Sequence, residues 1–94
     1  MSSAKRAASA YGVFKGDQSL TVSSTAVSLT VASDSLSALI TNGSNEIRVR
    51  WGTPTASVGH VLNPNSVMEV FNSMDTIELI ATGSDSTIFV TYFG

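Results

Sequence analysis

The chain has 94 residues, a net charge of −2 and no cysteine, so it is long enough for one small domain and excludes disulfides and thiolate metal sites. No apolar run approaches the roughly twenty residues that a membrane-spanning helix needs, and the first residues lack the apolar segment of a secretory signal. Charged residues form only 13% of the chain, and a surface with so few charges opposes association weakly, which predicts a protein covered by other proteins.

Residues 1–18 are expected to form a flexible, basic N-terminal arm, followed by a β-sandwich domain over residues 19–94. The arm has three cations ahead of its first acid, Asp17, whereas the rest of the chain is mildly acidic. Three charges give only a weak grip on a phosphate backbone, so docking of the arm on a protein neighbour is favoured over docking on nucleic acid. The predicted anchors of the arm are Lys5, Arg6, Tyr11 and Phe14.

From residue 20 onward, apolar and polar residues alternate with a period of two, which is typical of half-buried strands. The first alternating segments are 20–23 and 27–31, and a turn follows at 32–35. The next apolar run ends at Thr41 and is followed by Asn-Gly, a strong hairpin signal between two apolar runs. We therefore expect the strand that ends at Thr41 to pair with the strand that starts at Glu46.

The strand EIRVRW contains both arginines of the domain and the only tryptophan. Alternation places Ile47, Val49 and Trp51 on one face and the two arginines on the other. Trp51 is therefore expected to be a core residue at the end of a strand. Arg48 and Arg50 are candidates for charged contacts to a partner, with a plain solvated strand face as the alternative.

The segments VMEVF and TIFVTYF, near the end of the chain, have apolar residues on both faces. In the second segment, Ile88, Val90 and Tyr92 share one face, and Phe89 and Phe93 share the other. Strands of this kind lie centrally in a core or form a subunit contact.

About seven short strands, separated by turns and without helical periodicity, predict an all-β fold. The expected architecture is a single small antiparallel β-sandwich or barrel, jelly-roll-like, with an extended N-terminal arm.

The sequence contains few groups that could form a catalytic site. His60 is the only histidine, no serine lies in a G-x-S-x-G motif, and the carboxylates lack the clustering that zinc or calcium requires. Glu69 and Glu78 lie on neighbouring predicted strands and form one candidate carboxylate pair, although outward-facing residues that keep the sheet soluble are the favoured interpretation. We expect no enzymatic activity, no cofactor and no metal.

Two binding functions remain to be weighed. A nucleic-acid-binding barrel is disfavoured because the domain is acidic and Trp51 is predicted on the face opposite the arginines. A carbohydrate-binding sandwich is the alternative, because Trp51 and Tyr92 could stack on a sugar. His60 is predicted to lie at the end of a loop and to bond to the backbone.

One long stretch resembles a group of small virion structural proteins of tailed bacteriophages. It reads ALITNGSNEIRVRWGTPTASVGHVLNPNSVMEV and is followed by IELIATGSDSTIFVTYF. The shared features are an arginine-tryptophan strand, a PTASVGH loop, a turn with proline or glycine, a strand and a final ATG…D…VTY hairpin. The resemblance covers roughly residues 36–93 and leaves out the N-terminal arm.

The resemblance implies a β-sandwich subunit of a virion, and at this size a capsid decoration or cement protein. A tail or head accessory protein with a carbohydrate-binding β-sandwich is the alternative. The expected partners are the major capsid protein or other virion subunits, together with further copies in a homo-trimer or homo-dimer, because decorations sit on symmetry axes. The protein is expected to be made in the host cytoplasm and to reside in the virion, without a membrane or nucleic-acid partner.

Overall fold

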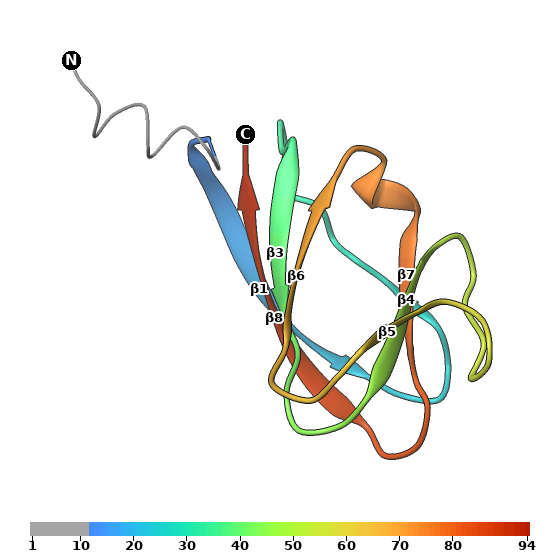
Figure 1. Cartoon of the computed structure of the whole chain (residues 1–94). Helices are drawn as coiled ribbons and strands as arrows, with labels where there is room; N and C mark the ends of the chain where they lie inside the picture. Colours follow the sequence, from blue (N-terminus) through green and yellow to red (C-terminus); the bar gives the residue numbers. More distant parts are fainter. Residues whose placement is uncertain (1–11) are drawn as a thin grey trace.

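The computed structural model describes residues 12–94, which form eight β-strands and one short 3₁₀ helix. The strands pack as two antiparallel sheets of four strands each, so the predicted all-β sandwich is confirmed (Figure 1). The elements are β1 (Phe14–Val22), β2 (Val27–Ser28), β3 (Ser37–Thr41), β4 (Ile47–Trp51), β5 (His60–Leu62), β6 (Val67–Phe71), η1 (Met74–Thr76), β7 (Ile77–Ala81) and β8 (Ser86–Phe93).

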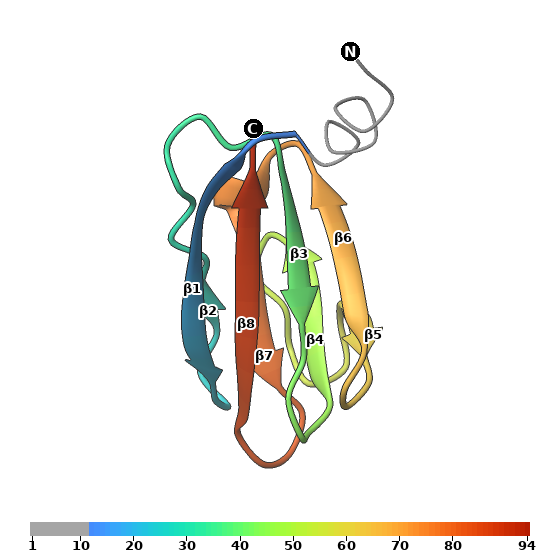
Figure 2. The ribbon, with the colours of Figure 1, turned by 90° about the vertical axis from the view of Figure 1, so that its left-hand side faces the viewer.

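The strand order is β1-β8-β3-β6 in one sheet, which we call sheet A, and β2-β7-β4-β5 in the other, which we call sheet B. Figure 2 looks onto the outer face of sheet A, with sheet B behind it. None of the helical residues in the range 12–94 forms a segment long and apolar enough to cross a bilayer.

The core lies between the sheets and follows the period-two alternation of the sequence. On β8, Ile88, Val90 and Tyr92 are buried, while Phe89 on the same strand is half exposed. Successive side chains of a strand point to opposite faces, so β8 supplies the core with one set and solvent with the other. The predicted division of this strand between two faces is confirmed.

Strand β1 begins inside the segment predicted as an arm. It pairs with β8 from Phe14 onward, so the expected boundary between residues 18 and 19 is wrong. A β-bulge between Phe14 and Gly16 and the polar residues of this strand hide its period from the sequence. The Tyr92 hydroxyl donates a hydrogen bond of 2.5 Å to the Gln18 Oε1, which binds β1 to the core. Lys5, Arg6 and Tyr11 lie outside the described residues.

The Asn-Gly segment after β3 is a crossing between sheets, so the predicted pairing of the strands on either side is wrong. Strand β3 pairs with β6 and β8 in sheet A, whereas β4 pairs with β5 and β7 in sheet B. Asn42 is buried, and its Nδ2 donates to the carbonyl oxygens of Leu62, Asn63 and Asn45. Its Oδ1 accepts from Ser86 Oγ, so the side chain ties both sheets together at this corner.

The segment predicted as a strand at 27–31 is mostly loop. Only Val27 and Ser28 pair, at the edge of sheet B, although Leu29 is buried in the core. The backbone N–H of Thr30 donates to the side chain of Gln18 instead of continuing a ladder. The long connection that follows reaches β3 across one end of the sandwich (Figure 1).

Candidate functional site

The outer face of sheet A is built from three rows of side chains that run across its strands. The register aligns outward residues of β1, β8, β3 and β6 in each row. The aromatic row is Phe14, Phe93, Ser37 and Phe71; the middle row is Asp17, Thr91, Leu39 and Glu69; the third row is Ser19, Phe89, Thr41 and Val67.

Large apolar side chains on this face are open to solvent. Phe14 is 59% exposed, Val67 58%, Phe71 52% and Phe89 48%. Large exposed apolar patches mark interaction sites on proteins, and these four side chains share one face of the sheet. The face therefore combines exposed apolar residues in two of its three rows, and Phe14, one of the predicted anchors, lies in its aromatic row.

Strand alternation indicated two apolar faces for β8 and β6 and assigned Phe89 and Phe93 to the second face of β8, either in a central core position or as a subunit contact. It did not single out Val67 and Phe71 of β6. The sequence did not show that β1, β8, β3 and β6 lie side by side. The joining of these residues into rows is a result of the strand order.

The outer face of sheet B differs, because its arginines are bonded within the chain. Arg48 donates through Nε to the Ala56 carbonyl oxygen at 3.0 Å and through Nη1 to the Gly59 carbonyl oxygen at 2.8 Å. Arg50 donates through Nη1 to the Thr53 carbonyl oxygen at 2.8 Å. Both arginines face outward as predicted, and both hold the 52–59 loop against the outside of β4.

Trp51 lies at the end of β4 and is 40% exposed, so its predicted core position is wrong. Its Nε1 donates to the Asn72 carbonyl oxygen at 3.3 Å, and its ring meets the His60 ring edge to face at a centroid distance of 6.1 Å. Alternation assigned the correct side of the strand. Trp51 projects beyond the last buried layer, however, and bridges the two sheets at the open end of the sandwich.

Tyr92, the other aromatic considered for sugar stacking, is buried and unavailable to a ligand. Burial raises the pKa of Tyr92 to about 12. The phenol is therefore a neutral core group that donates a hydrogen bond to Gln18.

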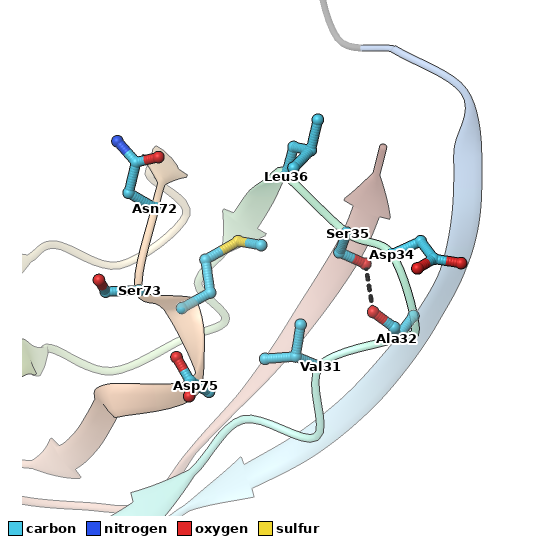
Figure 3. A pocket seen from close by; sticks show the side chains of 9 residues that line it. Val31, Ala32, Asp34, Ser35, Leu36, Asn72, Ser73 and Asp75 are labelled. Atoms are coloured by element: carbon cyan, nitrogen blue, oxygen red, sulfur yellow. Dashed lines mark hydrogen bonds between the residues drawn. The ribbon is translucent and has the colours of Figure 1, made fainter.

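A pocket of about 350 Å³ opens at one end of the sandwich, between the connection that leads into β3 and the turn around η1 (Figure 3). Its backbone is unusual, because Asp34, Asn72 and Ser73 have positive φ angles of 63°, 59° and 49°. Ser35 Oγ donates to the Ala32 carbonyl oxygen at 2.6 Å and so closes the turn at its rim. The pocket is lined by Val31, Ala32, Asp34, Ser35, Leu36, Asn72, Ser73, Met74 and Asp75.

The candidate carboxylate pair is not formed. Glu69 is on β6 of sheet A and Glu78 is on β7 of sheet B, so the two are not neighbours in one sheet. Glu78 Oε2 accepts a hydrogen bond from Thr53 Oγ1 at 3.3 Å. Over residues 12–94, no three side chains of His, Asp or Glu gather as a metal site.

Of the candidate residues described by the structure, Phe14 lies on the outer face of sheet A, whereas Arg48 and Arg50 lie on the outer face of sheet B. The predicted contacts are thus on opposite sides of the sandwich. No protein-family model, curated protein or solved structure matches this chain.

Proposed function

We propose that this chain is a non-enzymatic structural protein of a bacteriophage virion, a capsid decoration or cement protein that binds the assembled shell and stabilises it. The observation that supports the proposal most directly is the exposed apolar outer face of sheet A. The resemblance of residues 36–93 to phage virion proteins is the reason for proposing a virion, and the exposed face is the surface by which the protein would attach to it.

The mechanism is mechanical. Each copy buries part of the aromatic and third rows against shell subunits, and copies placed across a joint hold the two sides together. Many contacts that are individually weak add up through multivalency when the partner is a repeating surface. The proposed partner is the major capsid protein or another virion subunit, and the proposed location is the virion.

Homo-oligomers are part of the proposal, because a decoration on a symmetry axis is present as a dimer or trimer. Phe14 is the proposed contact that the fold supports, since it lies in the aromatic row. Lys5, Arg6 and Tyr11 remain proposed anchors outside the described residues. Arg50 remains a proposed charged contact on the outer face of sheet B because it is exposed, whereas Arg48 is bonded to the 52–59 loop.

The experiment is purification of particles from phage with and without the gene for this chain. We expect the protein in purified virions in a fixed ratio to the shell subunit, and we expect particles without it to lose resistance to heat or chelators. A Phe71→Ser variant should leave the particle fraction, whereas Arg48→Lys should stay in it. Protein found only in lysates and never in purified virions would contradict the proposal.

The exposed position of Trp51 favours a second function, that of a head or tail accessory protein with a carbohydrate-binding sandwich. An aromatic ring 40% open to solvent, beside His60, can stack on the apolar face of a sugar. A glycan array probed with the wild-type chain and with Trp51→Ala tests it. Binding that disappears in the variant while the fold survives supports the second function, and an array without signal removes it.

A further inference from the structure

The middle row of the outer face of sheet A carries a carboxylate at each end. Asp17 is on the edge strand β1, Glu69 is on the edge strand β6, and Thr91 and Leu39 lie between them. The two acids are three strand spacings apart, which is about 14 Å. Lys15, the only cation of the sheet A strands, lies at the bulge between the aromatic and middle rows with side-chain carbons beside Gly94, and the middle row itself contains two acids and no cation.

Pairing of two identical copies through this face brings like charges together. With a twofold axis parallel to the strands, β1 faces β6 of the other copy, so Asp17 meets Glu69 twice. With the axis across the strands and along the middle row, each strand faces itself, and each acid meets its own equivalent. Like charges that are juxtaposed in an interface oppose association and select against the wrong partner.

We propose that the outer face of sheet A binds a different protein, whose flat surface presents two Lys or Arg side chains about 14 Å apart with apolar side chains on both sides of the line that joins them. The apolar parts of the partner pack on Phe71 and Phe89, which lie on either side of the middle row, and the two cations pair with Asp17 and Glu69. This inference rests on the proposed function, since it defines the chemistry that the shell surface supplies. Two copies related by either of these axes would bring their acids together, so a second copy is not the proposed occupant.

The chain itself provides a probe with the required chemistry. An Asp17→Lys/Glu69→Lys variant keeps the apolar rows and presents two cations at the spacing of the two acids, and both positions are exposed. In analytical ultracentrifugation at low salt, a mixture of the wild-type and variant chains should form a 1:1 complex. We expect this association to be about tenfold or more tighter than that of either chain alone, and to weaken as salt screens the charge pairs.

The matched control is Asp75→Lys/Asp85→Lys, which makes the same change in net charge at exposed acids outside the face. Mixed with the wild-type chain, it should associate no more tightly than the wild type alone. Phe71→Ser in both chains of the first mixture should remove the complex, because the exposed apolar contact of the aromatic row is then lost. Circular dichroism of each variant verifies the fold.

Three results would overturn the inference. Wild-type chains that dimerise as tightly as the mixture, and lose the dimer in Phe71→Ser, would make a second copy the occupant. Equal association of both charge-reversed variants with the wild type would show that the pattern of charge plays no part. A tighter complex after Lys5→Ser/Arg6→Ser in the wild-type chain would make its own basic segment the occupant. None of these results depends on virions, so failure here is distinct from failure of the proposed function.

Discussion

On sheet B, the outward arginines of β4 are bonded by the chain's own 52–59 loop, whereas on sheet A Val67, Phe71 and Phe89 are exposed in the part of the chain that the structure describes. Arg48 and Arg50 donate to three carbonyl oxygens of that loop. Phe71 and Phe89, in contrast, are about half exposed, and the part of the chain described by the structure does not cover them. The comparison shows that charged residues can serve the fold while large apolar residues remain exposed.

The largest expected effect concerns the crossing that places β3 and β4 in different sheets. We expect Asn42→Ala to reduce the free energy of unfolding by about 2–4 kcal/mol, because it leaves buried carbonyl oxygens and the Ser86 hydroxyl without their partner. Urea unfolding followed by circular dichroism measures the change.

Asn45→Ala is the control for this prediction, because its Nδ2 bond to the Asp85 carbonyl oxygen is exposed. It should cost less than about 1 kcal/mol. Equal losses in the two variants would show that the buried amide does not hold the sheets together.

The next effect is a pH dependence of the free energy of unfolding, which arises from Tyr92 on the buried side of β8. The pKa of Tyr92 is about 12 in the folded chain against 10.0 for an unburied tyrosine, so the folded state keeps its proton where the unfolded state loses it. The stabilising contribution is complete below pH 10 and is lost as pH rises towards 12, with a total of about 2–3 kcal/mol.

Unfolding of wild type and Tyr92→Phe at several values between pH 8 and pH 12 checks this prediction. The wild-type free energy should fall more steeply than that of the variant above pH 10, and the two slopes should agree below it. Parallel curves over the whole range would contradict the assignment.

A third prediction concerns the bonded face of sheet B. Arg48→Met should destabilise the fold by about 1–2 kcal/mol, because two loop carbonyl oxygens lose their donor, whereas Arg50→Met should cost about 0.5 kcal/mol at its exposed bond. Elastase, which cleaves after small residues, should cut the 52–59 loop faster in Arg48→Met. If both variants behave like wild type, the arginines are not what orders the loop.

The smallest expected effect on stability concerns the exposed outer face of sheet A. Phe89→Thr should change the free energy of unfolding by less than about 1 kcal/mol, because its ring is half exposed and threonine suits a strand. Its neighbour Val90 is fully buried, and Val90→Thr should cost about 1–3 kcal/mol by placing a hydroxyl in the core. A large loss in Phe89→Thr would mean that this side chain supports the fold rather than a partner.

Local signals in the sequence predicted the two-faced strands well. The alternation in TIFVTYF identified Ile88, Val90 and Tyr92 as core residues because side chains on a strand alternate whatever the strand pairs with. The same rule chose the side of β4 on which Trp51 lies. It could not show that the core ends before this residue, since the length of a buried layer depends on the neighbouring strands.

The sequence predicted which strands pair with each other less well than it predicted where the strands lie. The Asn-Gly segment predicts a tight turn between paired strands. Instead, the Asn42 amide donates hydrogen bonds to the Leu62 and Asn63 carbonyl oxygens, and the chain crosses from sheet A to sheet B at this point. Strand β1 was missed before residue 19 because a bulge interrupts its alternation and its partner β8 is at the far end of the chain.

The sequence by itself determined that the protein is all-β, which residues of β8 form the core, and that several late strands have a second apolar face. Only the tertiary structure decided that those second faces join into one surface, and that the two arginines are bonded to a loop. The physical reason is that alternation is a property of a single strand, whereas a row of side chains across a sheet exists only once strands distant in sequence are hydrogen-bonded side by side.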